Sequence, residues 1–133
     1  MEDRLKYKTK QLKKAVNDLG VSLTINTNLM APEVIDTIKS GQVQKFEVVV
    51  DLLWKTLKIF LYEINGIIEN SPKKVIKKYF QIEECEYSDY EWLIKMINMR
   101  NELSHIYDSE KFEQIHSLLN EAFTVIKRVV KKI

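Results

Sequence analysis

The sequence predicts an all-α protein, folded as one antiparallel up-and-down bundle of four to five helices that takes in residues 1–133. Only 3 Gly and 2 Pro occur among its 133 residues, of which 45% are hydrophobic. Apolar side chains recur at threes and fours through most of the sequence, which is the helical period. This length supplies one hydrophobic core and too little for two, and short connections favour antiparallel neighbours.

The first helix is predicted from about residue 3 to the mid-twenties. Its apolar positions recur at helical spacing, at Leu5, Leu12, Val16, Leu19 and Leu23. The following stretch, INTNLMAPE, is predicted to be a connection because Asn and Thr compete locally for backbone hydrogen bonds. Pro32 suits the first turn of the next helix.

The second helix is predicted from about residue 32 to 65, and Ser40-Gly41 could separate its first turns. One broad apolar face runs along it, and a second apolar stripe contains Val48, Leu52 and Ile59, with Trp54 nearby. A small bundle covers one face of such a helix, so the second stripe predicts a homodimer or another protein partner. The alternative is that this helix is the centre of the bundle.

The remaining helices are predicted from their capping residues. Ser71 is the expected N-cap of a short third helix that begins at Pro72. Ser88 or Asp89 is expected to cap a fourth helix starting near Tyr90. A fifth helix, capped by Asp108 or Ser109, is predicted to carry apolar residues as far as Val130.

The net charge of +2, from 21 basic and 19 acidic residues, does not by itself indicate nucleic-acid binding. Lysines nevertheless gather in three runs, KYKTKQLKK, KKVIKK and IKRVVKKI. Such runs are most often solvated helix faces. The alternative is a surface that faces phosphate groups.

Several classes of site are not predicted. Cys85 is the only cysteine, which excludes an internal disulfide or a thiolate zinc site, and two distant His residues make poor metal ligands. A Gly-rich phosphate loop is missing, so no cofactor is expected. The sequence has neither a signal-peptide pattern at its start nor an apolar run of about 18 residues, which predicts a cytoplasmic protein.

The polar stretch RNELSHIY, residues 100–107, lies where the fourth helix should end. A row that begins with Leu93 and Ile97 becomes polar at Arg100, Ser104 and Tyr107, beside a second row that holds Asn101 and His105. Guanidinium groups bind phosphate, imidazole moves protons near neutral pH, and Asn and Ser can orient both, so the set suits phosphodiester chemistry. The alternative is that the helix dipole favours these cations.

The second histidine, His116, is expected on the fifth helix without polar neighbours of a similar type, and it is given no role. It serves as a comparison for His105. On sequence grounds, the polar cluster of the fourth helix is therefore the one candidate site.

The stretch Arg100-Asn101-Glu102-Leu103-Ser104-His105-Ile106-Tyr107 resembles the signature of HEPN-domain proteins, an Arg, four residues, a His, one residue and a Tyr. Within that superfamily the sequence is most similar to the nucleotidyltransferase substrate-binding-protein family. Gln44-Lys45-Phe46-Glu47 and Leu53-Trp54-Lys55-Thr56-Leu57-Lys58 resemble that family's long helix in order and spacing. The resemblance covers roughly residues 40–110.

This resemblance implies a HEPN bundle that dimerises so that the Arg/His motifs of both copies line one cleft. In an RNase of this kind, His105 would activate the ribose 2′-hydroxyl or protonate the leaving oxygen. Arg100 would stabilise charge on the phosphate, Asn101 would orient the reacting groups and Ser104 would support them. In paired toxin–antitoxin systems the nucleotidyltransferase attaches AMP to the motif tyrosine, here Tyr107.

Three hypotheses follow. The first is a partner subunit of a separate minimal nucleotidyltransferase, which is the toxin half of the pair and receives AMP on Tyr107. The second is an active, metal-independent endoribonuclease that uses Arg100 and His105 on RNA. The third is a purely structural dimeric bundle.

Overall fold

The computed structural model describes residues 2–83, 85–105 and 108–133 and contains helices and connections, without strands, across these residues. The prediction of an all-α bundle is confirmed, but the expected four to five helices are six. They are α1 (Glu2–Leu23), α2 (Pro32–Asn65), α3 (Pro72–Glu83), α4 (Tyr87–Leu103), α5 (Ser109–Ser117) and α6 (Leu119–Lys131).

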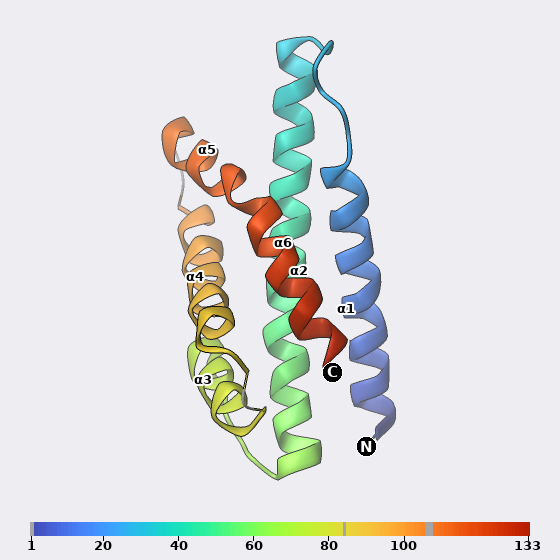
Figure 1. Cartoon of the computed structure of the whole chain (residues 1–133), viewed down its shortest axis with the longest axis vertical. Coiled ribbons are helices and arrows are strands. Elements are labelled where there is room, and N and C mark those ends of the chain that lie inside the picture. The colour runs from blue at the N-terminus through green and yellow to red at the C-terminus, as the bar shows by residue number, and fades with distance from the viewer. Residues whose placement is uncertain (1, 84, 106–107) are drawn as a thin grey trace.

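The long helix α2 is the axis of the molecule, with α1 packed along it and α6 crossing in front (Figure 1). In that view α1 and α4 run upward and α2 and α6 downward, while α3 lies beside the lower part of α2. With 34 residues, α2 extends beyond its neighbours at both ends. Val34 and Ile64 are therefore 47% and 56% exposed, although they belong to its predicted apolar face.

The core draws on all six helices and follows the predicted apolar rows. Ser40-Gly41 does not divide α2, which continues through both residues. No helix among the described residues is long and apolar enough to cross a membrane. The largest fully buried side chains are those of Tyr79, Phe46, Leu12, Leu19, Leu57, Leu61, Ile76, Leu93, Met96, Leu119, Ile126 and Val49.

The predicted start of the fourth helix is wrong by three residues, because α4 begins at Tyr87. Asp89, expected as a possible cap, lies in its first turn and is 2% exposed. Its carboxylate accepts hydrogen bonds from Arg128 of α6, with Nη2 2.7 Å from Oδ1 and Nε 3.4 Å from Oδ2. A buried carboxylate needs such a partner, so Asp89 joins α4 to α6 rather than capping its own helix.

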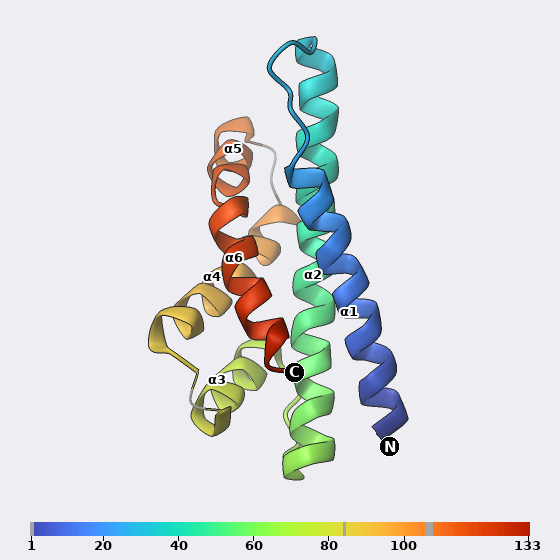
Figure 2. The same cartoon turned by 45° about the vertical axis from the view of Figure 1, so that its right-hand side comes forward.

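The predicted fifth helix is two helices. It begins as expected, because the side chain of Asp108 accepts a hydrogen bond from the backbone N–H of Glu110. The Ser117 hydroxyl then donates to the carbonyl of Gln114 at 2.6 Å, and the N–H of Leu118 bonds three residues back to Ile115. These tighter local bonds compete with the helical pattern, and the chain changes direction between α5 and α6 (Figure 2).

Two glycines have structural reasons. Gly66 ends α2 with φ +66°, and its N–H bonds to the carbonyl of Tyr62 at 3.0 Å, in a left-handed cap that glycine adopts without strain. Gly20 lets α1 approach α6, because a Cβ there would lie 2.6 Å from Cζ of Phe123. The close packing of α1 against α6 therefore depends on the missing side chain.

Candidate functional site

Arg100 lies in the last turn of α4 and reaches across to α2. Its Nη2 donates to Oδ1 of Asp51 at 3.0 Å, and the other oxygen of that carboxylate accepts from Lys55 Nζ at 2.8 Å. The Arg100 and Asp51 side chains are 36% and 29% exposed, so the pair is open to solvent. This pair fixes the guanidinium on the surface of α2.

A shallow hollow of about 510 Å³ surrounds this pair and is lined by Gln44, Glu47, Val48, Asp51, Leu52 and Arg100. Val48 and Leu52 were predicted as interface residues and Arg100 as a site residue. The fold brings these two groups from separate helices to one piece of surface.

Two acidic residues of this hollow, Glu47 and Asp51, were missed as site residues. They precede Lys55 at four-residue spacing on α2, and such a charged row beside an apolar stripe was the available signal. Burial raises the pKa of the Glu47 carboxyl, and the nearby charge of Arg100 partly opposes that rise. A phosphate that binds Arg100 must therefore compete with Asp51 for its N–H donors.

The rest of the motif lies at and beyond the end of α4. The helix ends at Leu103 with Ser104 as its C-cap, so the prediction that His105 continues a helical row is wrong. The backbone N–H of His105 bonds to the carbonyl of Glu102 at 3.0 Å, and its side chain is exposed. Because a turn replaces the helix here, helical spacing no longer sets the direction of the imidazole.

Asn101 and Ser104 do not contact the guanidinium through any hydrogen bond recorded for the described residues. The Asn101 side chain is exposed, and the Ser104 hydroxyl donates to the backbone carbonyl of Asn101 at 2.7 Å. Ser104 thus stabilises the turn after α4. The predicted modification site, Tyr107, lies outside the described residues.

The three predicted interface residues differ in exposure. Val48 is 47% exposed, Leu52 is half-buried, and Ile59 is 8% exposed. The chain itself therefore covers Ile59, while Val48 remains open on the surface of α2. The second apolar stripe faces solvent only along its first part.

His116 has the polar neighbours that its sequence context did not predict. Its Nε2 lies 2.7 Å from Oε1 of Gln42, and Nε2 of Gln42 donates to the carbonyl of Ser22 at 2.8 Å. Burial lowers the pKa of His116, the charge of Lys39 lowers it further, and Glu113 opposes both. The sequence separation of 74 residues hid this contact between α5 and α2, which is structural.

The profile of the family described as "nucleotidyltransferase substrate binding protein like" matches residues 7–132 of this chain. The chain belongs to this family. A nucleotidyltransferase substrate-binding-like protein is therefore the frame for the hollow at Arg100, and the sequence resemblance noted above is confirmed.

One solved structure is similar to this substrate-binding-like chain. It is the crystal structure of a protein from Thermus thermophilus, with a TM-score of 0.79 and 21% sequence identity. The likeness covers 91% of this chain and 97% of the other, so the two proteins share the fold. No curated protein matches the sequence.

Proposed function

We propose that this chain is the partner subunit of a separate minimal nucleotidyltransferase, and the toxin half of that pair. The family match over residues 7–132 supports an association with a nucleotidyltransferase. The observation that carries the proposal is the hollow in which Arg100 lies beside Val48 and Leu52. A protein that covers the apolar part of this surface borders the guanidinium and can control access to it.

The proposal includes a homodimer formed through the open part of α2. Two copies that bury Val48 against each other bring their Arg100 side chains to the edges of one interface. The apolar side chains supply the attraction, and the charged row of Glu47, Asp51 and Lys55 at the rim sets the register. The resulting cleft is the HEPN arrangement that the motif resembles.

The regulatory step is transfer of AMP to Tyr107. The phenol oxygen attacks the α-phosphorus of ATP, the bond to the β-phosphate oxygen breaks, pyrophosphate leaves and the phenol loses its proton. Tyr107 follows His105 by two residues, at most about 7 Å of extended chain, so an adduct there adds bulk and negative charge beside the motif. That charge would repel RNA from the cleft.

The test is co-expression with the nucleotidyltransferase encoded in the neighbouring reading frame, followed by co-purification and intact-mass measurement after incubation with ATP and Mg²⁺. We expect a stable complex and an increase equal to one AMP, which disappears in Tyr107→Phe. Tyr87→Phe is the matched control, because Tyr87 is 63% exposed on the same chain and should leave the increase unchanged. An increase retained in Tyr107→Phe would contradict the modification.

The second candidate function is metal-independent endoribonuclease activity, favoured by the exposure of Asn101 and His105 and by the partly exposed Arg100. His105 would take the proton of the ribose 2′-hydroxyl, whose oxygen attacks the adjacent phosphorus while the 5′-oxygen leaves. Arg100 carries five N–H donors and Asp51 receives one of them, so others remain for the phosphate. Asn101 would orient the reacting groups, and Ser104 supports the turn that carries His105.

Expression of the chain alone tests this activity. We expect growth arrest that Arg100→Ala and His105→Ala each relieve while circular dichroism shows unchanged helicity. Arg4→Ala is the control, because Arg4 lies on α1 and forms only a long 3.7 Å pair with Glu63. Arrest that survives both motif changes would remove the catalytic hypothesis and leave the partner-subunit proposal to the co-purification test.

A further inference from the structure

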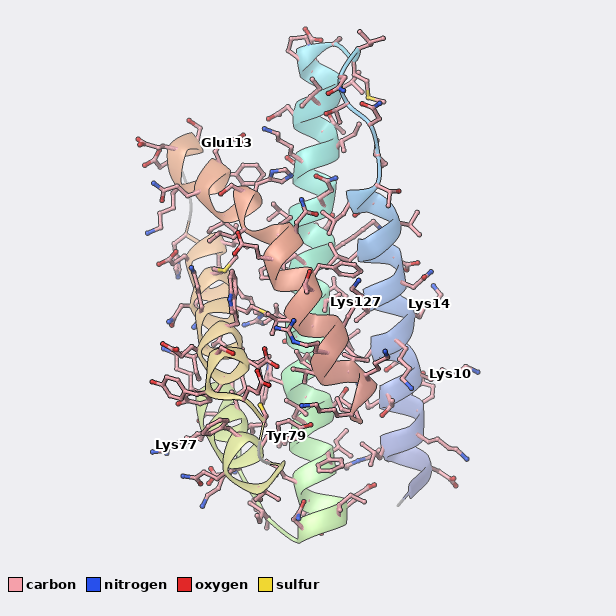
Figure 3. All side chains as sticks on the ribbon, in the orientation of Figure 1. Lys10, Lys14, Lys77, Tyr79, Glu113 and Lys127 are labelled. Atoms are coloured by element: carbon pink, nitrogen blue, oxygen red, sulfur yellow. The ribbon has the colours of Figure 1, made fainter. Side chains whose placement is uncertain are left out.

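The fold brings the first and last lysine-rich runs together. The helices α1 and α6 pack against each other although they come from opposite ends of the sequence (Figures 1 and 2). The amino groups of Lys6, Lys10 and Lys13 on α1 thereby share one side of the molecule with Lys127 and Lys131 on α6. In Figure 3, Lys127 lies between α6 and α1, and Lys77 of the middle run lies on the opposite side of the molecule from Lys10.

Two hollows run along this side and meet at Lys13. The lower one, about 630 Å³, is lined by Asp3, Leu5, Lys6, Thr9, Lys10, Lys13, Phe60, Ile64 and Ile133. The upper one, about 430 Å³, is lined by Lys13, Val16, Asn17, Gly20, Val21, Thr24, Phe123 and Lys127. We call the two together the α1–α6 groove. Its floor is apolar and most of its charged rim is lysine.

The lysines of the groove are electrostatically free. Within residues 2–83, 85–105 and 108–133, no ion pair involves Lys6, Lys10, Lys13, Lys127 or Lys131. Nearby basic residues outside the groove differ, since Lys14 pairs with Asp18 on the same helix. Asp3 is the single acidic residue in the lining. The groove therefore has unused positive charge around unused apolar surface.

We propose that the α1–α6 groove docks an acidic amphipathic helix of a partner protein. Lys6, Lys10 and Lys13 are spaced by four and three residues and form one row on α1, with Lys127 on the facing helix. Carboxylates at the same helical spacing on the occupant match that row, and its apolar stripe fits between the two rims.

The aromatic rings of the groove favour a protein over RNA. Single-stranded RNA binds through aromatic faces on which bases stack. The ring of Phe123 is covered by Lys127, whose Nζ is 4.8 Å from its centroid, and is closely approached by Gly20. Phe60 packs edge-to-face against Tyr79 at 5.8 Å.

The aliphatic floor points the same way. Ile64 is 56% exposed in the lower hollow, and its exposed area is removed from water by apolar side chains of an occupant. A phosphate backbone supplies no comparable surface. The floor and the lysine rim together match an occupant that has both apolar and acidic side chains on one face.

A fluorescence-anisotropy titration tests this inference with a labelled synthetic peptide of Leu, Ala and Glu. The peptide is about 18 residues, or about 27 Å as a helix, and places Leu on one face with Glu beside it. A second peptide of the same composition has Leu and Glu scrambled around the helix. An oligouridylate of equal charge is the nucleic-acid probe. We expect the amphipathic peptide to bind and the scrambled peptide to bind at least about tenfold more weakly.

The double variant Lys13→Glu/Lys127→Glu should weaken binding of the amphipathic peptide by about tenfold or more, because it reverses the charge at both rims. Lys73→Glu/Lys77→Glu, an equal charge change on exposed residues of α3, should alter affinity by less than about twofold. Ile64→Asn tests the floor and should weaken the peptide while leaving oligouridylate binding unchanged. Circular dichroism checks that each variant stays folded.

Equal weakening by the two lysine pairs, or equal binding of the two peptides, would overturn the proposal. Tighter binding of oligouridylate than of the amphipathic peptide would assign the groove to nucleic acid instead. No nucleotidyltransferase, ATP or motif residue enters the experiment, so its outcome is independent of the function proposed above.

Discussion

Asp89 at the start of α4 and Arg128 of α6 form an ion pair with Nη2 2.7 Å from Oδ1, although 39 residues separate them. The carboxylate side chain is 3% exposed and the guanidinium 53%, so the acid depends on its partner more than the base does. The hydrogen bond to Asp89 raises the pKa of Arg128. This pair holds together two helices that the sequence places in different parts of the bundle.

Arg128→Met should therefore lower the urea midpoint of unfolding, because it leaves a buried carboxylate without its partner. Lys127→Met, one residue earlier and exposed, is the control and should have little effect. The double variant Asp89→Asn/Arg128→Met should recover about half of the loss or more, since a neutral amide costs less to bury. An equal midpoint for Arg128→Met and Lys127→Met would show that the pair does not support the fold.

The contact between His116 and Gln42 predicts a pH-dependent stability. The lowered pKa of His116 means that the unfolded chain binds its proton more readily than the folded chain does. The contribution is complete above the ordinary pKa of 6.5 and is lost as the pH falls from there through the lowered pKa. The free energy of unfolding, measured in urea at about pH 7.5 and about pH 5.5, should fall more in the natural chain than in His116→Gln.

His116→Ala gives a second result at the higher pH. It leaves Oε1 of Gln42, a residue 7% exposed, without its donor and should cost about 1–3 kcal/mol of unfolding free energy. His105→Ala, in an exposed turn, is the matched histidine and should cost little. Identical pH profiles for the natural chain and His116→Gln would contradict the assigned effect of burial.

The two glycines inside helices should respond in opposite ways to alanine. Gly41 has open space around the position of a Cβ, so Gly41→Ala should stabilise the chain by about 0.5–1 kcal/mol through helix propensity. Gly20→Ala should not give this gain, because the new Cβ would lie 2.6 Å from the ring of Phe123. Thermal unfolding measures both, and an equal gain at the two positions would mean that Phe123 moves aside without cost.

The proposed dimer has a sharper test than the sequence alone offered. Val48→Asp places a charge on the exposed part of α2 and should give monomers in light scattering, with helicity unchanged. Ile59→Asp should instead destabilise the single chain, because Ile59 is 8% exposed before any partner binds. Unchanged association of Val48→Asp would contradict an interface at this surface.

Asp51→Asn should separate the phosphate chemistry of Arg100 from its structural role. The pair is partly exposed, so its loss should cost less than about 1 kcal/mol of stability. With the competing carboxylate removed, the Arg100 side-chain N–H signals should shift more during an NMR titration with inorganic phosphate. Asp18→Asn, at an exposed pair on α1, is the control. Equal shifts in the natural chain and Asp51→Asn would show that Asp51 does not restrain the guanidinium.

The helices themselves were predictable from local chemistry. Pro32 and Pro72 begin α2 and α3, Gly66 ends α2, and Asp108 caps α5, because each of these effects acts within one turn of backbone. The apolar rows likewise identified most of the core. The errors lie where a distant contact or a local side-chain bond changes the pattern, as at Asp89 and Ser117.

For the candidate site, the sequence by itself determined which residue types could do phosphate chemistry and which family they resemble. Tertiary structure alone decided that Arg100 meets Asp51, that Val48 shares its hollow, that Ile59 is covered, and that His105 lies in a turn. It also placed the two terminal lysine runs side by side. The physical reason is that spacing fixes neighbours only along one helix, whereas contacts between helices depend on how complete side-chain surfaces pack.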